Sequence, residues 1–363
     1  MNKQKKAAGK AKDSKKVKVA VGMSGGVDSS VAAALLKLKG YEVIGIFMQF
    51  WNDHDLEADD NKCCSLQAFN DAKKVAQLLK IPIYTMNFKQ PFKKFIVDNF
   101  IEQYRQGKTP NPCVRCNQLI KFGEFYKKAK ALGCEYIATG HYVQLSKNVP
   151  IKLLKGLDKT KDQSYFLYRL NSDILQHCLF PIGEYEKPEV RKLAEKLKLP
   201  VFNKKDSQEV CFVPTHGLES FFKKFLKLKP GKIVDLKGNV LGQHKGLPLY
   251  TIGQRRGMDL GGNGPYFVVK LDVVNNNLVV SNHPADLLTD EMIINEVNFI
   301  NKVRLPIELT VKIRYGHAGA RATVSKYKNN YKIKFIEPQR AITPGQSAVF
   351  YRGNELIGGG IIL

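Results

Sequence analysis

The sequence predicts an α/β fold, with a doubly wound N-terminal domain, a small β-rich central domain and a C-terminal β-barrel. Apolar strand-like runs alternate with amphipathic helical segments through the first half of the chain, as in a parallel sheet covered by helices. Short strands separated by glycine and asparagine turns follow in the second half. The predicted segments are a disordered basic leader over residues 1–16 and domains over residues 17–212, 213–282 and 283–363.

The stretch from Val17 to Ser30 organises the first domain. Val17, Val19 and Val21 form an apolar β-branched strand, a glycine turn follows over residues 22–26, and an alanine- and leucine-rich helix comes next. A glycine loop can approach an anion closely because it lacks Cβ atoms, and a helix start offers N–H groups to phosphate oxygens. We therefore expect a phosphate site here.

This loop lacks the feature that defines a Walker loop. A Walker loop needs Gly-Lys-Ser/Thr at the helix start, whereas Val27, Asp28, Ser29 and Ser30 occupy that place here. The string SGGVDSS instead resembles the loop of enzymes that cleave ATP between the α- and β-phosphates and adenylate an oxygen. That resemblance implies that the loop binds the leaving pyrophosphate and that Asp28 helps to place Mg²⁺. The alternative is a glycine turn that ends in a helix N-cap.

The remaining elements of the first domain follow in alternation. The expected strands are 17–21, 41–50, 81–88 and 135–140, and the expected helices are 63–80, 92–107 and 118–133. Ligands of such sheets lie beyond the carboxyl ends of the strands, where Met48 could pack against adenine or serve as a core residue. We expect a mobile acidic loop over Trp51–Lys62, and Cys63 and Cys64 as packing residues.

The charge of the chain favours a polyanionic partner. It contains 58 Lys and Arg against 33 Asp and Glu, a net charge of +25. The first 18 residues hold eight of these lysines and one aspartate, so most of the excess belongs to the remainder. An excess of this size suits a partner larger than a nucleotide, although lysine enrichment across a genome would produce the same excess.

The sequence contains neither an apolar signal-peptide core nor an apolar run of about 20 residues. We therefore expect a cytoplasmic protein without a membrane partner. In that reducing compartment its seven cysteines should not form a disulfide framework.

A C-x-x-C pair is the second chemical feature. Cys113 and Cys116 lie in TPNPCVRCN, predicted as a loop that precedes a helix, and the pattern suggests half of a zinc site or a redox pair. No second pair with zinc spacing occurs, so no metal-ligating residues are predicted. A cysteine just ahead of a helix start, between Arg115 and Lys121, favours a nucleophilic thiolate.

A second candidate thiol, Cys211, follows a polar turn in KKDSQEVCFVP. A buried structural cysteine is the default interpretation. An adenylating loop together with two accessible thiols, however, supplies the components for placing sulfur on an activated carbon.

The second half of the chain adds a basic surface. Basic and aromatic residues interleave on the predicted barrel strands, as an RNA-binding surface requires: Lys312, Arg314, Tyr315, Arg321, Lys326 and Tyr331. Arg255 and Arg256 lie beside glycines in a turn that contacts either phosphate or solvent.

Several motifs together resemble one enzyme family. GMSGGVDSS, GIFMQFW, TPNPCVRCNQLIKF, IATGHYV, KDQSYFLYRL, DSQEVCFV, GLPLYTIGQRRG and TPGQSAVFY follow one another in the order found in the tRNA-specific 2-thiouridylases. These enzymes make 2-thiouridine at the wobble position of the anticodon. GMP synthetases have a similar nucleotide loop, but the cysteine and DQSYFL motifs make the resemblance specific.

The resemblance implies ATP and Mg²⁺ as cofactors, tRNA as substrate and a sulfur-donor protein as partner. It implies an ATP site of Gly22, Met23, Ser24, Gly25, Gly26, Val27, Asp28, Ser29, Met48 and Gly140. Target-base contacts would come from Asn111, Pro112 and Cys113, and tRNA contacts from His141, Lys161, Asp162, Gln163, Arg314, Tyr315 and Gln346. The catalytic cysteine maps to Cys116 and the persulfide-carrying cysteine to Cys211, with a transient disulfide between them.

These assignments predict a reaction in which ATP adenylates O2 of the wobble uridine and sulfur replaces AMP. Cys116 either releases hydrosulfide from the Cys211 persulfide, leaving a disulfide, or bonds to C2 itself. The sequence does not choose between these routes. Two other classes remain as alternatives, an amidating ligase of the GMP synthetase type and a non-enzymatic RNA-binding module.

Overall fold

The computed structural model describes residues 16–51, 65–146, 148–205, 210–214, 217–261 and 265–363. Nearly all of the basic leader, most of the acidic loop expected over Trp51–Lys62, and the Cys63–Cys64 pair lie outside the described residues. No helix in the described part of the chain is long and apolar enough to cross a membrane.

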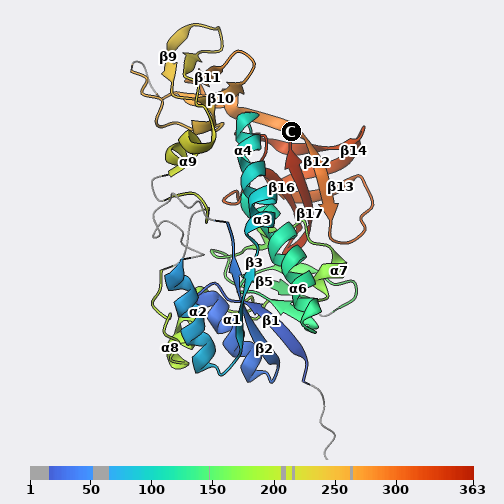
Figure 1. The fold of residues 1–363 in the computed structure, drawn as a ribbon. Coiled ribbons are helices and arrows are strands. Elements are labelled where there is room, and N and C mark those ends of the chain that lie inside the picture. Colours follow the sequence, from blue (N-terminus) through green and yellow to red (C-terminus); the bar gives the residue numbers. More distant parts are fainter. Residues whose placement is uncertain (1–15, 52–64, 147, 206–209, 215–216, 262–264) are drawn as a thin grey trace, which may run out of the picture.

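A parallel five-stranded sheet forms the centre of the N-terminal domain (Figure 1). Its order is β3-β2-β1-β4-β7, with bounds β1 (Lys18–Gly22), β2 (Glu42–Gln49), β3 (Ile83–Asn87), β4 (Tyr136–Ala138) and β7 (Cys178–Leu179). Valine and isoleucine fill its central strands, which are buried on both faces as expected for a parallel sheet. The predicted doubly wound α/β class is confirmed.

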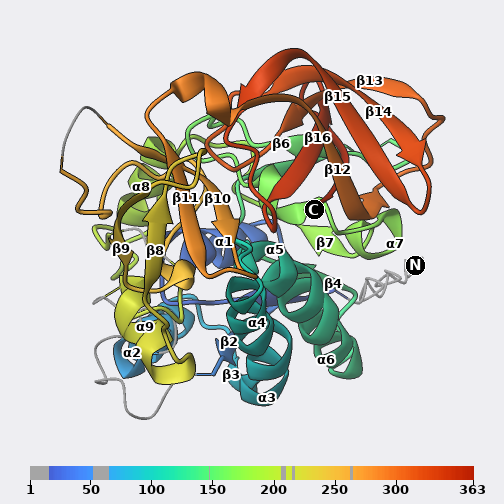
Figure 2. The same ribbon diagram turned by 90° about the horizontal axis from the view of Figure 1, so that it is seen from above.

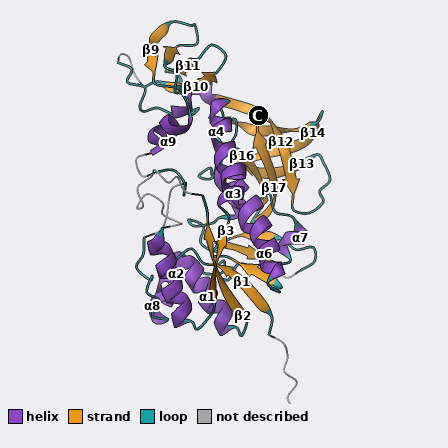
Figure 3. Ribbon diagram, in the orientation of Figure 1, coloured by secondary structure: helices purple, strands orange, loops and turns teal. Residues whose placement is uncertain are grey.

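Helices cover both faces of this sheet (Figures 1 and 3). On one face lie α1 (Val27–Leu38), α2 (Leu66–Leu78) and α8 (Lys187–Lys196), which share a hydrophobic core with β1 and β2. On the other face lie α3 (Lys89–Phe92), α4 (Asp98–Arg105), α5 (Pro112–Cys116) and α6 (Phe125–Ala131), whose core is largely aromatic. Further along the chain is the short helix α7 (Ser172–Leu175).

Four of these helices are joined in pairs, so that each pair forms one longer helix. A π-helical segment, Lys93–Val97, joins α3 to α4, and a second one, Asn117–Glu124, joins α5 to α6. The expectation that residues 109–117 form a loop was therefore partly wrong, because the helix already begins at Pro112. Asn111 caps it by accepting a hydrogen bond from the Cys113 N–H at 3.2 Å.

The central domain consists of α9 (Gly217–Phe225) and a four-stranded sheet of order β10-β11-β8-β9. Its strands are β8 (Gly231–Val234), β9 (Val240–His244), β10 (Phe267–Asp272) and β11 (Asn277–Ser281). β8 pairs with β9 and β10 with β11 in antiparallel fashion, as the turn residues predicted.

Six strands close the C-terminal barrel in the order β12-β15-β14-β13-β16-β17, with β17 pairing back onto β12. They are β12 (Leu288–Phe299), β13 (Ile307–Lys312), β14 (Ala320–Tyr327), β15 (Asn330–Arg340), β16 (Ser347–Arg352) and β17 (Glu355–Ile362). The predicted barrel is confirmed.

The barrel and the N-terminal domain are joined by hydrogen bonds. A hairpin of the first domain, β5 (Val143–Leu145) and β6 (Leu153–Lys155), extends the barrel sheet because β6 pairs with β17. The Tyr165 hydroxyl also donates to the Ser347 carbonyl at 2.9 Å inside the interface. Seen from above, the central domain and the barrel stand side by side over the N-terminal domain (Figure 2).

Candidate active site

The glycine loop between β1 and α1 has the geometry of an anion site. Gly26 is the N-cap of α1, and no side chain caps the helix there, so its first N–H groups face the loop. The hydroxyl of Ser29 turns back onto the loop and accepts a hydrogen bond from the Ser24 N–H at 3.2 Å. Ser30 donates to the Gly26 carbonyl at 2.8 Å, which tightens the same turn.

Only glycine fits at position 25. Its φ is +71°, in the left-handed region, and an added Cβ would lie 2.1 Å from the Ala68 carbonyl oxygen of α2. The backbone of the loop therefore packs directly against α2, with no space for a side chain at this position.

Two other residues from the predicted ATP site pack directly on this loop. A Cβ on Gly140 would lie 2.7 Å from the Ser29 nitrogen, so the end of β4 approaches the start of α1 closely. A Cβ on Gly22 would lie 2.7 Å from the Met48 methyl, so Met48 lies beside the loop at the end of β2. The remaining predicted members, Met23 and Val27, are buried core residues.

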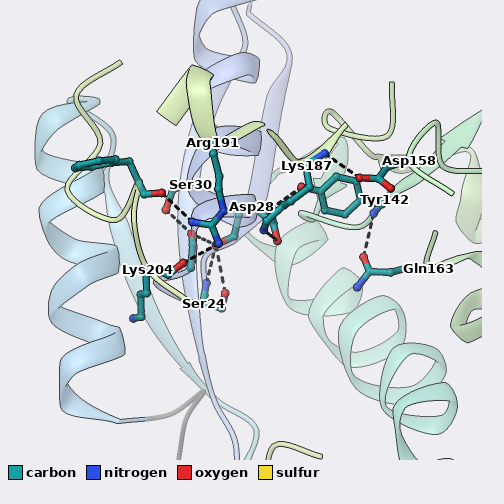
Figure 4. Close-up of polar contacts among 12 residues, drawn as sticks. Ser24, Asp28, Ser30, Tyr142, Asp158, Gln163, Lys187, Arg191 and Lys204 are labelled. Atoms are coloured by element: carbon teal, nitrogen blue, oxygen red, sulfur yellow. Dashed lines mark hydrogen bonds and ion pairs between the residues drawn. The ribbon is translucent and has the colours of Figure 1, made fainter. Parts of the chain in front are cut away.

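Asp28 lies at the centre of a polar network (Figure 4). The Lys187 ammonium, from the start of α8, donates to both of its carboxylate oxygens at 2.7 and 2.9 Å. The Tyr142 hydroxyl donates to Oδ1 at 2.8 Å. The Tyr142 N–H in turn donates to the Gln163 side chain at 3.0 Å, which links the loop to the DQSYFL motif.

A second cation lies beside the loop. The Lys204 ammonium donates to the Gly25 carbonyl at 3.0 Å and to Asp71 at 2.7 Å. Arg191 supports this arrangement by donating to the carbonyls of Phe202 and Lys204, each at 3.0 Å. The loop thus combines helix N–H groups, space without Cβ atoms and two lysines, a donor set that fits phosphate oxygens.

Cys116 lies inside a helix, one turn beyond its start. It is 7% exposed and belongs to the aromatic core, while Cys113 is exposed in the first turn. The expectation of a thiolate stabilised by the helix start therefore fits the position of Cys113 better, because the dipole effect fades within the first turn. Asn117, next to Cys116, donates to the Phe166 carbonyl at 3.2 Å and so joins this helix to the DQSYFL motif.

Cys211 packs against the same aromatic core. Its neighbour Phe212 is buried against Phe92 and Phe100, with ring centroids 5.8 and 5.2 Å apart. Cys211 is half-buried and contacts the cluster that contains Cys116. The five cysteines within the described residues are not disulfide-bonded to one another.

Of the predicted tRNA residues in the first domain, His141 and Asp162 are buried, and Lys161 and Gln163 are partly exposed. His141 is 8% exposed, its Nδ1 lies 2.7 Å from the Thr139 hydroxyl, and burial lowers its pKa well below the usual range. Asp162 is 7% exposed and accepts hydrogen bonds from the N–H groups of Gly156 and Ser164, each at 3.1 Å. Lys161 lies half-buried on the same turn.

The predicted tRNA residues of the barrel lie near this motif. Tyr315 is 42% exposed, and its ring packs on that of Phe166 with centroids 4.7 Å apart. Arg314, beside it, is exposed and donates to the Arg340 carbonyl at 3.3 Å. An accessible aromatic ring next to an arginine is suited to stacking an unpaired base.

Thr109 is the point at which three parts of the chain meet. Gln346 of the barrel donates to its carbonyl at 2.7 Å, and its N–H donates to the Pro344 carbonyl at 2.9 Å. Its hydroxyl lies 3.3 Å from that of Thr251 in the central domain. Because Thr109 comes just before the cysteine helix, both other domains help to position that helix.

Three family models match successive parts of the chain. Residues 17–215 match the family described as tRNA methyl transferase HUP domain, residues 219–282 the tRNA methyl transferase PRC-barrel domain, and residues 289–362 the aminomethyltransferase beta-barrel domain. The tRNA-specific 2-thiouridylase MnmA 2 of Thermoanaerobacter sp. (strain X514) is 50% identical over 355 residues, 95% of this chain and 97% of its own. The chain belongs to the tRNA-specific 2-thiouridylase family.

A second relative supports the same assignment. The 2-thiouridylase MnmA of Clostridioides difficile (strain 630) is 47% identical over 353 residues, 95% of this chain and 98% of its own. Among solved structures, NMN synthetase from Francisella tularensis aligns at 17% identity over 53% of this chain and 66% of its own, with a TM-score of 0.33, too low to support an argument. Membership of the 2-thiouridylase family disfavours the amidating ligase and the plain RNA-binding module.

Sequence reasoning missed the partners of the loop in this 2-thiouridylase. Tyr142, Lys187 and Lys204 reach the loop from distant parts of the chain, so no local pattern pairs them with it. One local signal does mark the start of α8. Glu186 and Glu189 form a capping box around Lys187, with a proline in the first turn.

Proposed function

We propose that this protein catalyses ATP-dependent 2-thiolation of the wobble uridine of tRNA. Family membership supports the overall reaction, sulfur transfer to a tRNA uridine. The observation that carries the proposal is the arrangement at the carboxyl end of the sheet. There Met48 borders the loop before α1 and also packs against the aromatic core in which both candidate thiols lie.

In this proposal the loop binds ATP through its phosphates. The departing pyrophosphate lies against residues 22–29 and the uncapped start of α1, Met48 and Gly140 border the nucleotide, and Asp28 would help to place Mg²⁺. Adenylation turns the uridine C2 oxygen into a good leaving group, since AMP departs when sulfur attacks C2. Water must be kept from the activated carbon, and the aromatic core around Cys116 provides apolar surroundings for that.

Sulfur arrives in this proposal as a persulfide on Cys211, loaded by a donor protein. Cys116 is the second thiol. It either attacks the persulfide, which leaves a Cys116–Cys211 disulfide and releases hydrosulfide to displace AMP from C2, or bonds to C2 itself with loss of AMP and is then displaced by the persulfide sulfur. The target base meets Asn111, Pro112 and Cys113 at the start of the helix, and leaves the anticodon stack to do so. The anticodon arm contacts His141, Lys161–Gln163, Arg314, Tyr315 and Gln346, and the reaction takes place in the cytoplasm.

The test is replacement of each thiol separately. Cys116→Ser and Cys211→Ser should each abolish formation of 2-thiouridine, measured by mass spectrometry of digested tRNA, while ATP binding persists. The matched control is Cys134→Ala, because Cys134 is buried near Lys18 at the amino end of β1, opposite the loop. Thiolation retained by either serine variant would refute the two-thiol assignment.

A further inference from the structure

The start of α8 carries a feature that the proposed chemistry has not used. Lys187 is the first residue of this helix, and its side chain is only 9% exposed. A cation at a helix N-terminus is unfavourable because it faces the positive end of the helix dipole. A buried lysine in that position needs a compensating anion, and Asp28 supplies it with two hydrogen bonds.

Stability alone does not explain this pair. The side chain of Asp28 is 32% exposed, so it is chiefly the Lys187 charge that is removed from water, and an apolar residue of similar size often stabilises such a site as well or better. Local arrangements that oppose ordinary preferences tend to mark functional sites. The partner here is moreover the one carboxylate that the loop motif contributes to the nucleotide site.

The backbone of Lys187 is fixed, whereas its ammonium group can change its hydrogen-bond partner. Asp158 accepts a hydrogen bond from the Lys187 N–H at 3.0 Å, which anchors the start of the helix. The ammonium lies 5.8 Å from the centre of the Tyr142 ring and in contact with Asp28 (Figure 4). A four-carbon side chain anchored at one end can redirect its ammonium over a few ångströms by changing rotamers.

We propose that Lys187 is a pyrophosphate-binding residue, which Asp28 holds beside the loop until Mg²⁺ occupies that carboxylate. The inference rests on the proposed function, since it assumes that the loop binds ATP. When the metal–nucleotide arrives, Asp28 faces the cation, and the released ammonium turns to the β- and γ-phosphate oxygens. Lys187 thus supplies from α8 the positive charge that a Walker loop carries on its own lysine.

Binding of inorganic pyrophosphate tests this without tRNA or sulfur. Isothermal titration calorimetry with Mg²⁺ present should show binding weakened about 10- to 100-fold in Lys187→Met, the effect of losing a charge-assisted hydrogen bond. Lys187→Arg should retain most of the affinity because it keeps the charge. The matched control is Lys192→Met, which removes an exposed lysine from the same helix and should bind as the wild type does.

The exchange of partners has its own test. Without metal, Asp28→Asn should bind pyrophosphate more tightly than the wild type, because it releases Lys187. When Lys187 is already replaced by Met, Asp28→Asn should increase the affinity for pyrophosphate much less. An equal gain in both backgrounds would mean that only the repulsion by Asp28 was removed, and would overturn the exchange.

Other outcomes separate this inference from the proposed function. Wild-type affinity in Lys187→Met overturns the role of Lys187 and leaves the nucleotide loop intact. Absence of pyrophosphate binding by the wild-type protein overturns the nucleotide site itself, and the inference with it. If Lys187→Met does not fold, as judged by its thermal unfolding, Lys187→Gln replaces it, because glutamine keeps a donor for Asp28 but lacks the charge.

Discussion

The nucleotide loop and the cysteine region are constructed in different ways. The loop is one contiguous stretch between β1 and α1, and its shape depends on close contacts with α2 and with Gly140. The cysteine region draws Cys116 from one turn inside a helix, Cys211 from a distant segment, and Gln346 from the barrel. The loop and its close contacts belong to one domain, whereas the core around the cysteines also contains residues of the central domain and of the barrel, such as Phe221 and Tyr351.

This difference separates the two half-reactions. Changes in the loop should impair ATP binding and adenylation with or without tRNA. Changes at the junctions between domains should impair thiolation and leave nucleotide binding intact. The predictions below test that separation, from the largest expected effect to the smallest.

Gly25→Ala should have the largest effect. The left-handed conformation costs an alanine about 1–2 kcal/mol, and the clash of its Cβ with the Ala68 carbonyl adds to this cost. The free energy of unfolding should therefore fall by about 3 kcal/mol or more. Chemical denaturation and nucleotide titration measure the two consequences. Gly26→Ala is the matched control, since φ there is −98° and the new Cβ makes only ordinary contacts, so its stability should stay within about 1 kcal/mol of the wild type.

Asp28→Ala should come next and act on adenylation. Removing the carboxylate should lower AMP formation about 100-fold, the usual scale for losing one electrostatic stabiliser of a transition state. The affinity for tRNA, measured by filter binding, should stay unchanged. A variant that forms AMP at the normal rate but fails to thiolate would contradict the assignment of Asp28 to the loop chemistry.

Gln346→Ala should have a moderate effect confined to thiolation. It removes the hydrogen bond to the Thr109 carbonyl, worth about 0.5–1.5 kcal/mol, so thiolation should fall several-fold while ATP binding without tRNA is unchanged. The control is Gln243→Ala, an exposed glutamine in the central domain. A parallel fall in tRNA affinity would show that Gln346 also contacts the RNA, as proposed above, whereas an unchanged rate of thiolation would contradict its part in positioning the helix.

His141 should give the smallest effect, visible in the pH dependence of stability. Burial, together with the nearby charge of Lys121, lowers the pKa of its imidazole below that of the unfolded chain. The unfolded state therefore binds more protons at acidic pH, and stability is lost as the pH falls below about 6.5. His141→Gln should flatten this dependence in urea denaturation at pH 7.5 and 5.5. If the free energy of unfolding changes with pH as much in His141→Gln as in the wild type, His141 does not contribute to the pH dependence of stability.

The loop could be predicted from sequence because its geometry is local. Glycines, an aspartate and three serines in a fixed order where a strand leads into a helix describe the phosphate site almost completely. The start of the cysteine helix is also marked locally, because Asn111 is an N-cap and Pro112 is a proline in the first turn. It was predicted as a loop because two prolines lie close together there.

The side chains that contact the loop, and the contacts between domains, could not be predicted from local sequence. Lys187 and Tyr142 meet Asp28 only because α8 and the end of β4 pack against α1 in the folded chain. The contact of Gln346 with Thr109 depends on how two domains dock, which no local pattern records. Asp162 and Gln163 were expected to contact RNA from a motif alone, and their internal hydrogen bonds depend equally on tertiary structure.

The ladder between β6 and β17 has a consequence for the way the molecule unfolds. Leu153 and Leu356 are buried where these strands pair, so separating the barrel from the first domain would expose an unpaired strand edge and apolar side chains. The two regions should therefore melt in a single cooperative transition. A barrel expressed on its own should be prone to aggregate through that edge, whereas the central domain shares no ladder with either neighbour in the described residues.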